Sequence, residues 1–159
     1  MRAVAAAAGV SERTIYRYFE NRDALYEAAR PLFSGTAGIP LCATVEELPA
    51  YARELFLTFN RNARLVTTLL TSAWAQELLR RSRASNLAAL RALIDAGFAR
   101  APVAERSAAA ASLRVVLSGS SWLYLRDCGL APDQSIAHTQ WLTRTLLERL
   151  SKMARRRTA

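Results

Sequence analysis

The sequence is poor in the residues that build metal centres and disulfide frameworks. Its 159 residues include two cysteines, Cys42 and Cys128, and a single histidine, His138. The cysteines lie far apart and have no histidine at metal-ligand spacing, so we expect free thiols and no metal site. Nucleophile elbows and phosphate-binding glycine loops are also absent. We therefore expect a protein that is not an enzyme and that carries no cofactor.

Long hydrophobic runs and strand-like alternation are missing as well. No apolar run reaches the roughly 18 residues that a membrane span needs, and the N-terminus does not have the pattern of a signal peptide. We therefore expect a cytoplasmic protein. Alanine, leucine and arginine are abundant, whereas glycine and β-branched runs are sparse, and this composition favours helix. With 52% hydrophobic residues the chain should fold, and the predicted fold class is all-α.

The formal net charge of +9 is compatible with nucleic-acid binding. However, residues 1–31 hold five arginines against four acids, so this segment is nearly neutral. Most of the excess lies in residues 80–83 and in the tail 149–157. We interpret the first run as a solvated face. A weaker hypothesis is that residues 155–157 hold the chain on an anionic surface.

The most informative stretch runs from Val4 to Tyr26. A short apolar helical segment leads to Gly9, which can adopt the left-handed backbone that ends a helix. Ser11 is a suitable N-cap for a second helix. In that helix Ile15 and Phe19 share one buried face, while the other positions carry hydroxyls, rings and guanidinium groups. Two short helices joined by a glycine turn describe a helix-turn-helix, whose second helix enters the DNA major groove.

The residues from Val4 to Leu25 also resemble the tetracycline-repressor (TetR) family of bacterial regulators. The family pattern apolar-Ala-x-x-Ala-Gly-Val-Ser-x-x-Thr-apolar-Tyr-x-Tyr/His-Phe-x-x-Lys/Arg-x-x-Leu is matched throughout, and Arg22 stands where the family commonly has lysine. The resemblance implies a DNA-binding segment and places this chain's contact residues at Ser11, Arg13, Thr14, Tyr16, Arg17, Tyr18 and Arg22. Their chemistry suits phosphates and base edges. The alternative is that the tyrosines are core residues and the arginines are merely solvated.

In the resembled family a further helix precedes this stretch and packs across it. Here the chain begins three residues before Val4. We therefore expect part of the cover to be missing from the apolar side chains Val4, Ala8, Ile15, Phe19 and Leu25. We interpret this as a truncated start, and the alternative is an incomplete DNA-reading unit.

The rest of the chain is expected to be helical. Asn21 should cap a third helix from Arg22 towards Phe33, followed by a loop at residues 35–40. We expect a helix-turn-helix DNA-binding domain over residues 1–31 and a helical ligand-binding and dimerisation domain over residues 32–159. Thr44 and Glu47 have capping-box spacing. Further helices are predicted at residues 49–59, 63–72, 74–96, 103–128 and 133–153.

The last two predicted helices carry apolar residues on more than one face. Because a monomer of this size buries only one such face well, we expect the two helices to pair with a second copy as a four-helix bundle. The resemblance also implies a homodimer, and a purely intramolecular core is the alternative. The expected interface residues are Leu113, Val116, Leu117, Ser120, Tyr124, Trp141, Leu142, Thr145 and Leu146.

The predicted body is also rich in aromatic residues. Such residues at helical spacing form either a core or an apolar pocket between helices. For the pocket, the expected ligand-binding residues are Tyr51, Phe56, Phe59, Trp74, Trp122 and Arg126.

Taken together, these features predict a homodimeric transcriptional repressor on a palindromic DNA operator. A small apolar effector would release it by favouring a state that no longer fits the DNA. The alternative is a ligand-sensing or heterodimerising helical protein that does not bind DNA because the first helix is missing.

Overall fold

The computed structural model describes residues 1–21, 23–25, 28, 41–71 and 73–156, without the side chains of residues 3, 7 and 73–83. All regular structure in these ranges is helical, so the predicted all-α fold class is confirmed. No helix within them is long and apolar enough to cross a membrane. The chain divides into two compact units, Met1–Gly38 and Ile39–Ala159. The boundary expected at residues 31–32 falls within the first unit.

The first unit contains α1 (Arg2–Ala8) and α2 (Glu12–Tyr18), which pack against each other. Asn21 then caps a further helical turn, as predicted. Its side-chain oxygen accepts a hydrogen bond of 2.8 Å from the Ala24 amide, and residues 23–25 are helical. The remainder of the predicted third helix and the loop at residues 35–40 lie outside the described residues.

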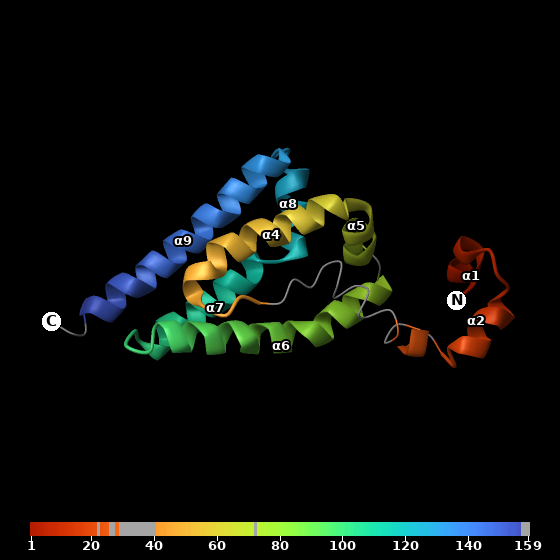
Figure 1. Cartoon of the computed structure of the whole chain (residues 1–159), viewed down its shortest axis with the longest axis horizontal. Coiled ribbons are helices and arrows are strands. Elements are labelled where there is room, and N and C mark those ends of the chain that lie inside the picture. Colours follow the sequence, from red (N-terminus) through yellow and green to blue (C-terminus); the bar gives the residue numbers. More distant parts are fainter. Residues whose placement is uncertain (22, 26–27, 29–40, 72, 157–159) are drawn as a thin grey trace. The chain divides into compact units, whose positions relative to one another are not determined.

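The second unit is a bundle whose elements can be followed in Figure 1. In chain order they are η1 (Val45–Glu47), α4 (Leu48–Arg61), α5 (Ala63–Thr71), α6 (Ala73–Gly97), α7 (Val103–Val116), α8 (Gly119–Asp127) and α9 (Pro132–Arg156). Helix α4 lies beside the first half of α9, and the two make the most extensive contact in the unit. Helix α7 packs against both α6 and α9, which closes the core.

Helix α9 buries a stripe of small polar side chains. Ser135, Thr139 and Thr143 follow at intervals of four residues and are all buried, so they form one stripe along the helix. The Thr139 and Thr143 hydroxyls each donate a hydrogen bond of 2.8 Å to the carbonyl four residues earlier. These two hydroxyls are therefore satisfied without a partner from α4. Helix α4, the main neighbour of α9, buries apolar side chains, among them Phe56.

The predicted capping box is present, although it opens a 3-10 turn rather than α4 itself. The Glu47 carboxylate accepts hydrogen bonds from the backbone amides of Ala43, at 3.0 Å, and Thr44, at 3.3 Å. Helix α4 then begins at Leu48, and Pro49 lies in its first turn. Proline is tolerated there because that turn has no intrahelical acceptor for its amide.

The prediction of one helix over residues 103–128 was wrong. Helix α7 ends at Val116 and a new helix, α8, begins at Gly119. The break is made by Ser118, whose hydroxyl donates to the Val115 carbonyl at 2.7 Å and accepts from the Ser121 amide at 3.0 Å. Serine competes with helical backbone bonding in this way. The break also changes which residues of the two halves share a face.

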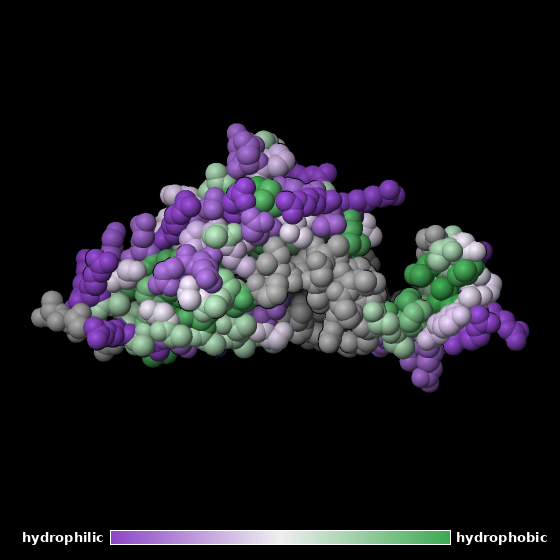
Figure 2. Space-filling model, viewed as in Figure 1, coloured by the Kyte–Doolittle hydropathy of each residue, from purple (hydrophilic) through white to green (hydrophobic). Residues whose placement is uncertain are grey.

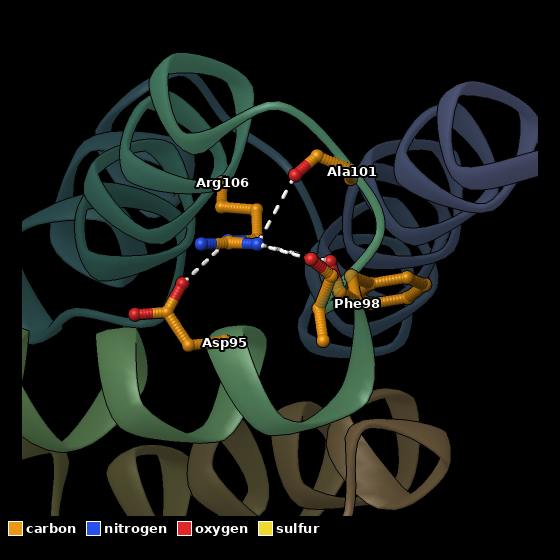
Figure 3. A network of polar contacts seen from close by, with 5 residues as sticks. Asp95, Phe98, Ala101 and Arg106 are labelled. Atoms are coloured by element: carbon orange, nitrogen blue, oxygen red, sulfur yellow. Dashed lines mark hydrogen bonds and ion pairs between the residues drawn. The ribbon is translucent and has the colours of Figure 1, made fainter. Parts of the chain in front are cut away.

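The turn between α6 and α7 is held by one arginine (Figure 3). The Arg106 guanidinium donates to the carbonyls of Phe98 (3.5 Å), Ala99 (2.7 Å) and Ala101 (3.1 Å). It also forms an ion pair of 2.6 Å with Asp95 of α6. Carbonyls at a helix end lack intrahelical partners, so this single side chain satisfies the backbone of the turn and ties α7 to α6.

Candidate nucleic-acid interface

Helix α1 ends in a tight turn that requires glycine. Gly9 has φ 66° and ψ 26°, the left-handed conformation predicted for this position. The Val10 amide bonds to the Ala5 carbonyl at 3.0 Å, and the Gly9 amide bonds to the Ala6 carbonyl at 3.3 Å. This pattern satisfies the last carbonyls of α1. The chain can then turn within three residues, which is the spacing of a helix-turn-helix.

Ser11 starts α2 as its N-cap, as predicted. Its backbone is extended, and its hydroxyl oxygen accepts a hydrogen bond of 3.1 Å from the Thr14 amide. The hydroxyls of Ser11 and Thr14 are also hydrogen-bonded to each other at 2.9 Å. Glu12 lies in the first turn, where a negative charge is favourable. The hydrogen bonds between Ser11 and Thr14 therefore fix the position at which α2 begins.

The two short helices share a small buried face. Ala5 of α1 and Ile15 of α2 are buried, whereas Phe19, expected to be buried beside Ile15, is only partly covered. Val4 and Val10 are exposed. Ile15 is the one buried residue of α2, and the rest of this seven-residue helix is exposed except for Thr14, which is half-buried.

The exposed surface of α2 combines two arginines and two tyrosines. Arg13 and Arg17 are exposed, and the residues Tyr16 and Tyr18 are 50% and 69% exposed. In the space-filling view α2 forms a hydrophilic surface, in contrast to the largely hydrophobic α1 (Figure 2). Arg13, Tyr16 and Arg17 share one side of the helix, and Tyr18 lies about 160° around it from Tyr16; we call these four exposed residues together the α2 face. Each tyrosine presents an apolar ring that ends in a hydroxyl able to form a hydrogen bond.

Arg17 and Tyr18 are already arranged as a pair. The Arg17 guanidinium carbon lies 5.1 Å from the centre of the Tyr18 ring, which is the geometry of a cation–π contact. One guanidinium nitrogen also donates to the Tyr18 hydroxyl at 3.3 Å. Because Tyr18 accepts this bond, its own hydroxyl hydrogen remains free to donate to a phosphate oxygen. The pair therefore offers an anion two neighbouring donors.

This arrangement suits the DNA major groove. The groove admits one α-helix, and arginine can bond two acceptors of guanine or a phosphate. Of the seven contact residues predicted from the sequence, Arg13, Tyr16, Arg17 and Tyr18 form the α2 face, and Ser11 and Thr14 form the cap beside it. Arg22 lies outside the described residues.

A cavity of about 240 Å³ lies in the second unit, where the end of α4 and the start of α5 meet α8 and α9. The residues that line it are Asn60, Ala63, Trp122, Arg126, Leu130, Pro132 and Ser135. The Trp122 indole donates a hydrogen bond of 2.8 Å to the Asn60 side chain. The Arg126 guanidinium carbon lies 5.7 Å from the centre of the Trp122 ring.

Of the residues predicted to bind a ligand, only Trp122 and Arg126 line this cavity. Phe59 packs on Trp122 with ring centres 6.0 Å apart, and Phe56 continues the cluster at 5.9 Å from Phe59. Both phenylalanines are buried in the core. Tyr51 is partly buried, and burial raises the pKa of its hydroxyl. The Trp74 side chain lies outside the described atoms.

Sequence reasoning missed Asn60 and Ser135. Asn60 is a polar residue near the end of α4, after its regularly spaced apolar residues. Its partner Trp122 lies 62 residues further along the chain. No local pattern reveals such a pair. Ser135 was missed because a serine near a helix start is usually interpreted as a cap. No group of acids, histidines and cysteines that could hold a metal ion occurs in the described part of the chain.

The residues predicted for a dimer interface fall into two groups. Leu113 and Leu117 are buried in the core of this chain, so they pack against its own side chains. The other predicted residues reach the surface at least in part, namely Val116, Ser120, Tyr124, Trp141, Leu142, Thr145 and Leu146. Among them, Tyr124 is 69% and Trp141 57% exposed.

Residues 1–29 match the family model described as bacterial regulatory proteins, tetR family. The matched segment contains α1, the Gly9 turn, the Ser11 cap and the α2 face. No curated protein and no solved structure matches the chain.

Proposed function

We propose that this chain, a transcriptional regulator of the tetR family, is a repressor that binds a DNA operator through the α2 face and is released by a small molecule. The observation that carries the proposal is the α2 face itself. These two arginines and two tyrosines are exposed on a short helix that is capped by Ser11 and buries Ile15. These four side chains contribute little to the stability of the first unit, because they are exposed rather than packed within it.

The α2 face supports DNA contact through two kinds of group. The guanidinium groups of Arg13 and Arg17 supply the positive charge that displaces counterions from phosphates. The hydroxyls of Tyr16 and Tyr18 are donors suited to phosphate oxygens. The cap at Ser11 fixes where α2 begins, and this sets the position of all four side chains in a groove.

A homodimer is part of the proposal. Tyr124 of α8 and Trp141 of α9 are large aromatic residues exposed on the body. Exposed aromatic residues of this size are typical of protein–protein interfaces. Two copies paired there would carry two α2 helices, which would fit half-sites about one helical turn, roughly 34 Å, apart on DNA.

An effector would act by binding one state of the dimer more tightly than the other. The cavity lined by Trp122 and Arg126 is its proposed site. This cavity includes residues of α8 and α9, the helices that carry Tyr124 and Trp141. A ligand there can shift the dimer between states only to the extent that its affinity differs between them.

Footprinting of the full-length gene product on the DNA upstream of its own gene tests the proposal. We expect protection of a roughly palindromic site with two half-sites about one helical turn apart. Sedimentation of the same preparation should give a dimer. A protein that protects no specific site, with excess nonspecific DNA present as competitor, would contradict the operator function and leave a ligand-sensing protein.

A further inference from the structure

The size of the cavity between α4, α5, α8 and α9 limits what it can hold. Its volume of about 240 Å³ is below the roughly 300–1,000 Å³ of sites for drug-sized ligands. A single aromatic ring or a short alkyl chain with one polar group is therefore the largest ligand that it encloses well.

The polar groups on the cavity wall are all able to donate hydrogen bonds. The Arg126 guanidinium is a donor that accepts no hydrogen bond, and it forms no ion pair with any residue that the structure describes. The Asn60 side-chain oxygen already accepts the Trp122 indole hydrogen at 2.8 Å. What Asn60 can still offer most readily is its amino group, which is a donor.

Ser135 supplies the third donor. The residue is only 3% exposed, yet its hydroxyl forms no hydrogen bond with the described residues, although it lines the cavity. The Ser135 carbonyl is used separately, as the acceptor of the Thr139 hydroxyl. The Ser135 oxygen is not among the described buried atoms that lack a hydrogen-bond partner, so solvent still reaches it and a ligand in the cavity can replace that solvent as its partner.

The rest of the wall is apolar or aromatic. Ala63, Leu130 and Pro132 carry no polar side-chain group, and the Trp122 indole N–H is already bonded to Asn60. No acidic side chain is among the described residues that line the cavity. Three donors, one of them a cation, beside an apolar wall match a ligand with a carboxylate at one end and a hydrocarbon body at the other.

We propose that this cavity binds a small aryl or alkyl monocarboxylate. The carboxylate bonds Arg126, Ser135 and Asn60, and the hydrocarbon body lies against Leu130 and Pro132. This ligand class replaces the wholly apolar effector expected from the sequence. Its role as the effector rests on the proposed function, whereas its binding rests on the cavity alone.

Calorimetric titration of the full chain with benzoate and phenylacetate tests the binding. We expect both to bind, and benzamide, the neutral analogue of benzoate, to bind at least tenfold more weakly because it lacks the charge that Arg126 recognises. Arg126→Gln should weaken benzoate by about tenfold, equivalent to about 1.4 kcal/mol. The matched control is Arg144→Gln, which removes an exposed arginine of α9 outside the cavity and should leave the affinity unchanged.

The position of the ligand has its own readout. The Trp122 indole hydrogen lies at the cavity wall, so benzoate should shift its NMR signal, assigned by elimination with Trp74→Phe and Trp141→Phe. Ser135→Ala, which keeps the site packed, should weaken benzoate severalfold. Failure of both acids to bind, equal binding of benzamide, or equal losses in the two arginine variants would overturn the proposed ligand class.

Footprinting with and without benzoate separates the two proposals. Loss of the footprint on adding benzoate supports both. A footprint that persists while benzoate binds the Trp122 site contradicts its role as the effector but confirms the ligand class. Binding of benzoate without any footprint confirms the ligand class and contradicts the operator function.

Discussion

Gly9 and Gly97 each lie at the end of a helix, but for different reasons: Gly9 for its backbone conformation and Gly97 for its lack of a side chain. Gly9 has a left-handed backbone and nothing within 4 Å of the place where a Cβ would lie. Gly97 has no such backbone, but a Cβ there would lie 2.6 Å from a methyl carbon of the buried Val45. The sequence predicts that a helix stops near Gly97. It does not show that the missing side chain makes room for η1.

Gly97→Ala is therefore expected to destabilise the body. The added methyl group must displace Val45, and such overpacking costs about 1–3 kcal/mol, more than alanine gains in helix propensity. Urea unfolding measures the change. Gly119→Ala is the control, because its Cβ would lie 3.3 Å from the end of the Leu70 side chain, which can move. Equal destabilisation of the two variants would contradict the close approach of Val45.

Tyr51 makes stability depend on pH at the alkaline end. Burial, and then the neighbouring Cys42, raise the pKa of Tyr51 above its ordinary value of 10.0. The unfolded chain therefore loses this proton at a lower pH than the folded chain, so stability falls as pH rises above about 10. Tyr51→Phe should make this fall shallower in urea unfolding across that range. Tyr124→Phe, at an exposed tyrosine, should not, and an equal effect of both variants would contradict the role of burial.

At the scale of elements, the Arg106 hydrogen bonds fix how α7 follows α6. The side chain bonds three carbonyls of the turn and pairs with Asp95, and it is largely buried. These bonds replace the intrahelical partners that the end of α6 lacks.

Arg106→Gln is expected to lower the free energy of unfolding by about 1.5–3 kcal/mol, the range for hydrogen bonds to charged groups. Arg106→Lys should recover only part of this, because an ammonium lacks the planar fork that reaches several acceptors. Chemical unfolding of the variants measures both. Arg100→Gln, at an exposed arginine of the same turn, is the control, and a comparable decrease there would show that the hydrogen bonds of Arg106 are not responsible.

The helices themselves were largely predictable because their signals are local. The stop at Gly97, the capping box at Glu47 and the cap at Asn21 each depend on residues within one turn. The break at Ser118 was missed because Ser118 and Gly119 are tolerated within helices. Helix α7 ends there because the Ser118 hydroxyl donates to the Val115 carbonyl and accepts from the Ser121 amide.

At the scale of the whole molecule, the two candidate sites differ in how far they follow from the sequence. Helix α2 is made by seven consecutive residues that follow its cap, so its buried side and the exposed residues of the α2 face can be inferred from their order. The cavity joins Asn60, Trp122 and Ser135 from three helices. Only packing of the chain brings them together, and the sequence indicated Trp122 and Arg126 alone.

Pairing of two copies is expected to depend on the exposed aromatic residues of α8 and α9. Trp141→Lys places a charge where a second copy would pack, and desolvating it should raise the dimer dissociation constant at least tenfold. Sedimentation over a range of concentrations measures this. Val103→Lys alters an equally exposed apolar residue on α7, and it should leave the dimer intact. A monomer in the unmodified protein, or equal effects of both variants, would contradict this interface.

The most direct test of DNA recognition by the α2 face is the salt dependence of DNA affinity in two matched variants. Arg17→Gln removes a guanidinium that Tyr18 holds on α2, whereas Arg144→Gln removes an exposed arginine of α9. Measured by fluorescence anisotropy on the footprinted site, Arg17→Gln should weaken binding and reduce the slope of log affinity against log salt by about 1 for each phosphate that Arg17 neutralises. Arg144→Gln should change neither. Equal affinities and slopes for the two variants would show that the α2 face does not bind DNA.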